Sequence, residues 1–329
     1  MGVAGVRRKG TDTPVTLNDK WHLGSDTKAM TATLIGKLVE CGQLRWDTTM
    51  AEAFPELASG FDPQNRQITV VQLLTHQSGL PRDLAWWDYS HEGTVQQQRL
   101  KVIKQALSAP PEPGNNFEYS NLGYVIAGAV IEKVTAKAWE QEMQDEIFTP
   151  LHMDGAGFGT MAMTEEPDQP GAHNSSGKPV VFGPHDVPPV VGPAARVYCR
   201  LDDWAKFATD QLRGARGKDG LLKAHTYLIL HTPTLDSATY AMGWIVAQPS
   251  WSDGPVLTHD GTNGMSYSSV WIAPDSDLAI LVCTNQAGNT ADKACNEAVH
   301  ALVAIHDRRN PRPRAGSSAS SVSRPATAP

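Results

Sequence analysis

The spacing of apolar residues changes near residue 240 from a helical to a strand-like period, and this change constrains the fold more than any other feature. Helical patterns cover residues 201–212 and 223–230. Three later runs, residues 240–248, 266–272 and 278–284, are rich in aromatic and aliphatic side chains and are bounded by Gly, Asn, Pro and Asp. Such runs are typical of strands. The sequence therefore predicts three consecutive antiparallel strands late in the chain.

A last helix is expected after these strands. Asn289 or Thr290 can cap its N-terminus, because both side chains accept hydrogen bonds from the backbone amides of a first helical turn. We expect the helix to turn one apolar face toward the strands, formed by Ala294, Ala298, Leu302 and Ile305.

The N-terminal part of the chain predicts two strand edges and a buried helix. Residues 5–8 and 21–23 have strand character, and a helix is expected from about residue 26 to residue 40, with Gly42 as its stop. Apolar residues cover most of this helix, so most of it should be buried. The predicted fold class is α/β, of the α+β type: an antiparallel sheet flanked by helices and built from both chain ends, with a mainly helical region inserted.

Two helices are expected within the inserted region. The first begins at Thr69, where Thr69 and Gln72 form a capping box and Ile68 faces Leu73 as a hydrophobic staple, and it should stop at Pro81. The second begins near Leu122. Its small residues indicate close packing against another element; they are Gly123, Ala127, Gly128 and Ala129.

Composition and charge predict one large domain and a tail. The chain has 329 residues, of which 40% are hydrophobic, enough for a large core. We expect one domain over residues 1–306, with a sheet region at about 1–45 and 235–306 and a helical region at about 46–234. Residues 307–329 carry five Arg and one Asp among Pro, Ser and Ala, a composition that predicts disorder. The total charge of −7 then leaves −11 on the first 306 residues, which argues against a nucleic-acid surface.

The sequence does not favour an exported, a membrane-spanning or a cofactor-dependent protein. Residues 1–10 lack the apolar core of a signal peptide and no stretch has the length of a membrane span, so the chain as written is expected to be cytoplasmic. A displaced start would hide an export signal and predict a periplasmic or secreted protein. The four cysteines have no metal-ligand spacing, and neither a metal nor an organic cofactor is predicted. Residues 151–193 are irregular and long, as expected of a segment that shapes a substrate pocket.

The first indication of chemistry is Ser25-Asp26-Thr27-Lys28, which opens the N-terminal helix. Residues at i and i+3 share a helix face, so the Lys28 amine can reach the Ser25 hydroxyl. The motif alone is weak, since about one Ser-x-x-Lys is expected by chance in a chain of this length. Ser175-Ser176-Gly177-Lys178 is such a match, because no helix is predicted there to fix its spacing.

Three separated motifs together resemble one family. Ser25-x-x-Lys28, Tyr119-Ser120-Asn121 on a loop, and His259-Asp260-Gly261 leading into a strand are similar to the motif set of the serine β-lactamase and penicillin-binding-protein superfamily. The resemblance is nearest to its class C and family VIII carboxylesterase branch and covers about residues 5–306. Two further stretches support it, Leu73 to Leu80 and Gly192-Pro193-Ala194. It implies a serine hydrolase that works through an acyl-enzyme.

The resemblance implies a role for each motif residue. Ser25 is the nucleophile, and Lys28 and Tyr119 share the role of base, for which the pKa of each would have to be lowered by its neighbours. Asn121 orients Lys28 and the acyl side chain. The oxyanion hole maps onto the backbone amides of Ser25 and Thr262. Other readings remain open: Ser25 and Asn121 are also possible helix N-caps, and Tyr119 a buried anchor.

The third motif departs from the family pattern. Many members have Lys-Thr-Gly where this chain has His259-Asp260-Gly261, so a mostly neutral His replaces a fixed cation and Asp260 adds negative charge. Like charges disfavour binding, which argues against substrates with a carboxylate at this position. His259 is expected either as a site wall or as a catalytic helper. His76 is expected to bind backbone, and Trp86 and Trp87 to pack or to line the pocket.

The function predicted is therefore that of a carboxylesterase acting on small neutral esters. A β-lactamase or a D-amino-acid peptidase is the alternative within the enzymes. A binding or sensor protein that recognises penicillins without turnover is the alternative outside them. The partner expected is a small-molecule ester or amide, and the sequence leaves the oligomeric state open. The absence of a Gly-x-Ser-x-Gly motif argues against an α/β-hydrolase.

Overall fold

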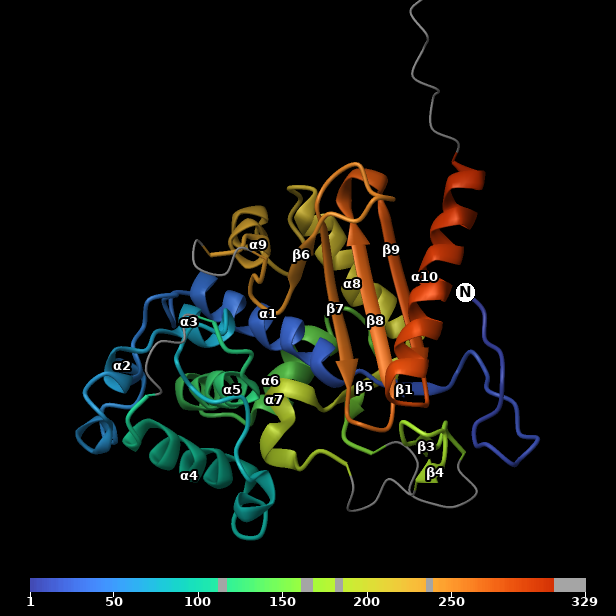
Figure 1. Ribbon diagram of the computed structural model, residues 1–329. Coiled ribbons are helices and arrows are strands. Elements are labelled where there is room, and N and C mark those ends of the chain that lie inside the picture. The colour runs from blue at the N-terminus through green and yellow to red at the C-terminus, as the bar shows by residue number, and fades with distance from the viewer. Residues whose placement is uncertain (112–116, 161–167, 181–185, 235–238, 311–329) are drawn as a thin grey trace, which may run out of the picture.

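The computed structural model describes residues 1–111, 117–160, 168–180, 186–234 and 239–310 (Figure 1). The helices are α1 (Thr27–Glu40), α2 (Met50–Ala53), α3 (Val70–Leu74), α4 (Val95–Ser108), α5 (Asn121–Thr135), α6 (Trp139–Met143), α7 (Gly192–Ala195), α8 (Leu201–Ala215), α9 (Ala224–His231) and α10 (Asn289–Arg309). The strands are β1 (Lys20–His22), β2 (Gly157–Phe158), β3 (Ala172–His173), β4 (Pro179–Val180), β5 (Val197–Arg200), β6 (Ile245–Ala247), β7 (Val256–Thr262), β8 (Tyr267–Ala273) and β9 (Leu278–Thr284). Short 3₁₀ turns include η1 (Gly24–Asp26) and η4 (Trp86–Tyr89).

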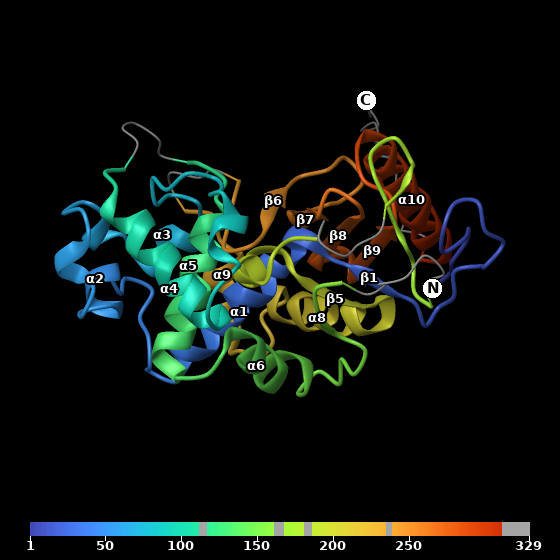
Figure 2. The same ribbon diagram turned by 90° about the horizontal axis from the view of Figure 1, so that it is seen from below.

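A four-stranded antiparallel sheet in the order β6-β7-β8-β9 lies between α8 and α10 (Figure 2). Alternate residues of a strand point to opposite faces. On β9, Ile280 packs with Val299 and Val303 of α10, whereas its neighbour Leu281 packs into the main core. Trp204 of α8 belongs to that same core. The predicted fold class, an antiparallel sheet flanked by helices with a helical region inserted, is confirmed.

The prediction that this sheet is built from both chain ends was wrong in one respect, because the N-terminal strand β1 does not join it. Instead β1 pairs with β5, which also pairs with β2, in a separate three-stranded sheet. Leu23, at the end of β1, donates its backbone amide to the Val197 carbonyl. This pairing places the chain that enters α1 beside the end of α7, and so positions the Ser-x-x-Lys motif.

The late strands were predicted incompletely. The structure contains β7 between the first and second predicted runs, so the three predicted strands are not consecutive. His259-Asp260-Gly261 lies within the strand β7 itself and not ahead of a strand. The first run, residues 240–248, forms a strand only at β6, residues 245–247. The irregular segment at 151–193 contains the short strands β2, β3 and β4; its residues 161–167 and 181–185 lie outside the described residues.

The prediction for α10 was wrong in its cap and in its buried face. The N-cap is Gly288, and no side chain caps the helix. The buried residues are Ala291, Cys295, Val299 and Val303. Leu302 and Ile305 remain 40% and 36% exposed. The buried residues are each shifted by one position from the predicted ones, which is a rotation of about 100° around the helix axis. The contact with β9, and not the size of the side chains, selects the buried face.

The helix α10 also continues to Arg309, past residue 307 where the tail was predicted to begin. Residues 311–329 of that tail lie outside the described residues. Within the described part of the chain, none of the helices combines the length and the apolar character that crossing a membrane requires. The four cysteines are free thiols.

Helix α1 is buried along most of its length, as predicted. The capping box of Thr69 and Gln72 is present, but α3 ends at Leu74, well before Pro81. His76 takes a left-handed conformation with φ 60° and turns the chain away. The small residues of α5 allow the predicted close packing: a Cβ on Gly128 would lie 2.1 Å from Cγ of Pro193 in α7.

Candidate active site

Three of the predicted site residues meet at the Lys28 amine. Lys28 Nζ lies 3.1 Å from Ser25 Oγ, one turn before it, and 2.7 Å from Asn121 Oδ1, at the start of α5. It also donates to the backbone carbonyl of Ala194, at 3.0 Å. The stretch Gly192-Pro193-Ala194 lies in α7, and the backbone carbonyls of α7 accept hydrogen bonds from side chains of α1. Three chain segments converge on one buried nitrogen.

Burial changes the ionisation of Lys28. The side chain has no exposed surface, and removal from water lowers its pKa to about 7. The charge of Asp83 acts in the opposite direction, followed by smaller effects of Arg82 and Asp26. A substantial fraction of Lys28 is therefore neutral near pH 7, as a proton acceptor for Ser25 must be.

Tyr119 reaches the same hydroxyl from the loop before α5. Its hydroxyl is hydrogen-bonded to Ser25, and its ring centre lies 4.8 Å from Lys28 Nζ. Burial raises the pKa of Tyr119, so its hydroxyl stays protonated at neutral pH. The lowered pKa that the sequence interpretation required of Tyr119 is not found.

His76 supports this loop, and it bonds the backbone as expected. Its Nδ1 accepts from the amide of Ser120 at 3.0 Å, and its carbonyl accepts from the amide of Glu118 at 2.9 Å. The His76 ring centre lies 4.4 Å from that of Tyr119. Burial lowers the pKa of His76 well below its usual value, so it is a neutral support for Tyr119.

The end of β7 packs directly on the turn η1 that carries Ser25. A Cβ on Gly24, whose φ is 48°, would lie 2.3 Å from the backbone nitrogen of Thr262. A Cβ on Gly261 would lie 1.8 Å from the carbonyl oxygen of Leu23. Only glycine at both positions allows the two backbones to approach this closely. This close approach places the backbone of Ser25 next to the backbone of Thr262, the two residues predicted to donate their amides to an oxyanion.

His259 and Asp260 occupy different environments. The buried His259 ring bonds Tyr240 Oη through Nε2 at 3.2 Å and the Asp260 carbonyl through Nδ1 at 2.9 Å. Burial and the nearby Lys28 charge lower the pKa of His259 to about 4. Its ring is therefore neutral near pH 7. Asp260 is exposed and lies beside the site.

Ser25 opens onto two cavities of about 470 Å³ each, which also share Arg82 and Thr262. The first is walled by aromatic and apolar side chains and the third motif: Phe117, Tyr119, Thr239, Tyr240, Ile245, His259 and Asp260. The second is lined by the indoles of η4, by polar groups and by residues 186–195: Asp83, Trp86, Trp87, Asn121, Asp186, Val187, Pro188, Val191, Ala195 and Asn263. A substrate bound at Ser25 can place one group on either side.

Among the lining residues that sequence reasoning missed are Arg82, Asp83, Tyr240 and Asn263. Arg82 and Asp83 follow closely after Leu80, which ends the stretch from Leu73 that resembles the family. This closeness to a family-like stretch could have indicated them as site residues. Tyr240 lies in a predicted strand, and nothing local marks it as a site residue.

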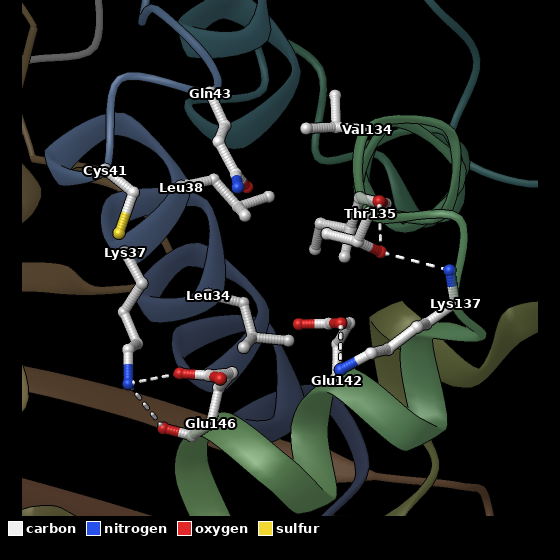
Figure 3. A pocket seen from close by; sticks show the side chains of 11 residues that line it. Leu34, Lys37, Leu38, Cys41, Gln43, Val134, Thr135, Lys137, Glu142 and Glu146 are labelled. Atoms are coloured by element: carbon white, nitrogen blue, oxygen red, sulfur yellow. Dashed lines mark hydrogen bonds and ion pairs between the residues drawn. The ribbon is translucent and has the colours of Figure 1, made fainter.

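Another cavity, of about 310 Å³, lies at the opposite ends of α1 and α5 (Figure 3). Two ion pairs line it: Lys37 with Glu146 at 2.6 Å, and Lys137 with Glu142 at 3.2 Å. None of its eleven lining residues is a predicted site residue. The second Ser-x-x-Lys, residues 175–178, forms the turn between β3 and β4 and not a helix. Across the described ranges, no group of three or more His, Cys, Asp or Glu residues is suited to hold a metal ion.

Comparison with known proteins matches the family described as Beta-lactamase over residues 1–304. Penicillin-binding protein 4 of Amycolatopsis lactamdurans is 26% identical over 299 residues, which are 86% of this chain and 76% of that protein. Protein flp of Staphylococcus aureus is 27% identical over 291 residues; the match covers 86% of this chain but 56% of flp, so the chain spans little more than half of that relative. The structure of D-amino acid amidase from Ochrobactrum anthropi SV3 is similar with a TM-score of 0.72 at 22% identity, over 93% of this chain and 90% of the amidase.

Proposed function

Because the chain belongs to the Beta-lactamase family, a family of serine hydrolases, we propose that it hydrolyses small neutral carboxylic esters through an acyl-enzyme on Ser25. The observation that carries the proposal is the 3.1 Å contact between Ser25 Oγ and Lys28 Nζ, made by an amine whose pKa is near 7. A serine hydroxyl is a poor nucleophile without such a base, and Lys28 supplies one within hydrogen-bond reach.

Acylation begins when neutral Lys28 takes the Ser25 proton and Oγ attacks the ester carbonyl. The carbonyl oxygen becomes an oxyanion, for which the amides of Ser25 and Thr262 are the proposed donors. The tetrahedral intermediate collapses, the ester C–O bond breaks, and the Lys28 ammonium returns its proton to the departing alkoxide. Tyr119 takes part as a neutral hydroxyl bonded to Ser25, so the proposal assigns the base to Lys28.

Deacylation repeats these steps with water. Lys28 takes a proton from a water molecule, the resulting hydroxide attacks the acyl carbonyl, and the intermediate releases the carboxylic acid. Ser25 Oγ recovers its proton from the Lys28 ammonium. Asn121 holds the same amine through its amide oxygen in both halves of the reaction.

The charges at the two cavities favour a neutral substrate. Asp260 is exposed at the first cavity, and the neutral His259 beside it offers no fixed cation. The guanidinium of Arg82 lines both cavities, but its Nε lies 3.4 Å from Asp83 Oδ2, which offsets its charge. A substrate carboxylate would therefore meet more repulsion than attraction.

Hydrolysis of amino-acid amides is the second candidate. The observation in its favour is the exposed Asp260 carboxylate at the cavity that Ser25 shares, since a free ammonium group of a substrate can pair with it. Among the structurally similar proteins, two are named D-amino acid amidase or D-stereospecific amidohydrolase, and we extend that substrate class to this chain only as this second candidate.

The test compares the wild type with Ser25→Ala, and uses Ser175→Ala as the matched control because that serine belongs to the other Ser-x-x-Lys. Substrates are p-nitrophenyl acetate and butyrate, D- and L-phenylalanine amide, and a chromogenic cephalosporin, with folding followed by circular dichroism. Ester turnover that is lost in Ser25→Ala alone supports the leading proposal. If an amide or the cephalosporin is turned over faster than the esters, the proposed function changes to amidase or β-lactamase. Stable labelling of Ser25 without turnover indicates a sensor. Activity that survives in Ser25→Ala rules out the mechanism.

A further inference from the structure

A hydrogen-bonded chain continues from the active site beyond Asn121. The Asn121 side chain accepts from Lys28 Nζ through Oδ1 at 2.7 Å and donates from Nδ2 to Asp83 Oδ1 at 2.8 Å. The same Asp83 oxygen accepts from the indole nitrogen of Trp86 at 2.9 Å. The order is Trp86, Asp83, Asn121, Lys28, Ser25, and every neighbouring pair is in contact.

We propose that Asp83 is a positioning residue that fixes the orientation of the Asn121 amide and, through it, the place of the Lys28 amine, while its own charge acts on that amine directly. The inference rests on the proposed role of Lys28 as the base. Asp83 forms no hydrogen bond with Ser25 or Lys28, so its hydrogen bonding reaches the amine through Asn121.

The chemistry of the groups gives the chain a single direction. An ionised carboxylate only accepts hydrogen bonds, so the Asn121 group that faces Asp83 must be the NH₂. The oxygen of the Asn121 amide must then face Lys28. Without Asp83, the amide can rotate by 180° and present its NH₂ to the amine, where it no longer accepts the Lys28 hydrogen bond.

The segment that carries Asp83 is built onto the start of α5. The Arg82 carbonyl accepts from the amide of Asn121 at 2.8 Å, and the Pro81 carbonyl accepts from Ser120 Oγ at 2.8 Å. A carboxylate is also favourable at a helix N-terminus, where backbone amides leave a partial positive charge. The Asp83 carboxylate is therefore placed by contacts to the two residues that precede it, although its side chain is 41% exposed.

Charge is the second property that Asp83 transmits. After burial, Asp83 is the strongest influence on the pKa of Lys28, and it favours the ammonium. Other groups facing Lys28 are Asp26 and Arg82, the neutral histidines His76 and His259, and the rings of Tyr119 and Tyr124. Loss of the Asp83 charge removes a stabilisation of the ammonium, so the pKa of Lys28 is expected to fall.

Two variants separate the charge from the hydrogen bond. The Trp86 indole can only donate a hydrogen bond, so in Asp83→Asn it keeps the oxygen of the new amide turned toward itself. This oxygen can still accept the hydrogen bond from Asn121. Asp83→Ala removes both properties. Asp88→Asn, an exposed carboxylate in η4, is the control.

The first readout is the titration of Lys28 by NMR in protein containing ε-¹³C-lysine, with the Lys28 signal identified by its loss in Lys28→Met. The expected result is a titration midpoint at lower pH in Asp83→Asn than in the wild type and Asp88→Asn. The second readout is the rate at which a fluorophosphonate labels Ser25, where Oγ forms a bond to phosphorus and fluoride leaves. Asp83→Ala should lose about 10- to 100-fold in this rate, by analogy with residues that orient the ligands of a metal ion, and Asp83→Asn should lose less than Asp83→Ala.

An unchanged Lys28 midpoint in Asp83→Asn would overturn the proposal, as would a labelling rate in Asp83→Ala equal to that of the wild type. If Asp83→Asn and Asp83→Ala lose the same amount of labelling rate, the direction of the Asp83–Asn121 hydrogen bond does not orient the Asn121 amide. The NMR titration does not depend on turnover. A protein that hydrolyses no ester but shows the shifted midpoint would therefore refute the proposed function and leave the role of Asp83 in place.

Discussion

Ser268 on β8 donates a hydrogen bond of 2.6 Å to Asp26, the residue that follows Ser25. Asp26 is 2% exposed, and burial raises the pKa of its carboxyl well above the usual value. The nearest ring nitrogen, His259 Nδ1, lies 3.6 Å from the other carboxyl oxygen. This pair links the turn η1, which contains Ser25, to an inner strand of the four-stranded sheet.

Replacement of this acid predicts a change in the pH dependence of stability. A carboxyl whose pKa is higher in the folded state binds its proton more tightly there, so its contribution to stability is complete below the unfolded pKa and is lost as pH rises toward the folded pKa. The wild type should therefore lose stability relative to Asp26→Asn as pH increases above 4, by up to about 1.4 kcal/mol per pH unit. Urea unfolding at pH 4.5, 6 and 7.5 measures the difference, and parallel curves for the two proteins would contradict it.

Gly261 predicts a large loss of stability on substitution. In Gly261→Ala the new methyl group would lie 1.8 Å from the carbonyl oxygen of Leu23, a backbone atom that cannot move aside without shifting η1. We expect a loss of about 3 kcal/mol or more, the upper range for added volume in a packed interior. Gly60→Ala is the control, because a Cβ there meets nothing within 4 Å, and its stability should change by less than about 1 kcal/mol. Thermal unfolding of both variants gives the comparison, and similar melting temperatures would refute the close approach.

Removal of the Lys28 amine should abolish most of the ester hydrolysis. Lys28→Met keeps the length of the buried chain but offers no proton acceptor, and loss of a general base costs about 100- to 10,000-fold in rate. In the wild type, kcat/KM should fall as pH drops below about 7, since Lys28 becomes protonated with a pKa of about 7. A pH profile that stays flat down to pH 5 would exclude Lys28 as the base.

Tyr119 should matter less than Lys28. Tyr119→Phe removes one neutral hydrogen bond to Ser25, worth about 1 kcal/mol, so kcat/KM should fall roughly fivefold. The pH at which activity is lost should stay unchanged, because the Lys28 amine remains. A loss in Tyr119→Phe as large as that in Lys28→Met would instead assign the base to the tyrosine.

That Ser25, Lys28 and Asn121 meet in space could be expected from the sequence, because a helical spacing and the resemblance of the motifs to one family both point to it. Ser25 and Lys28 are one helical turn apart, and Asn121 begins the helix that was expected near Leu122. By contrast, the partnership of Asp83 and Asn121 joins residues that are 38 positions apart, and no local pattern indicates it. It depends on how α3 and α5 pack, and on the turn that His76 makes at φ 60°.

The strand β7 was missed for a related reason. Its sequence, Val-Leu-Thr-His-Asp-Gly-Thr, contains two aliphatic residues and no apolar alternation over its second half. Thr258 and His259 are nevertheless buried, because β6 and β8 pair with the strand on its two sides and the turn η1 covers Gly261. Tertiary contacts thus override a weak strand propensity.

The bonds of Lys28 also bear on how the protein folds. Its partners Asn121 and Ala194 are 93 and 166 residues away along the chain, so the amine is held only after two distant segments have docked on α1. Contacts between residues so far apart in sequence form slowly, since a long loop must close before they stabilise the chain. During refolding, helical signal should therefore recover earlier than the reactivity of Ser25, and in a newly made chain the contacts of Lys28 should be among the last native contacts to form.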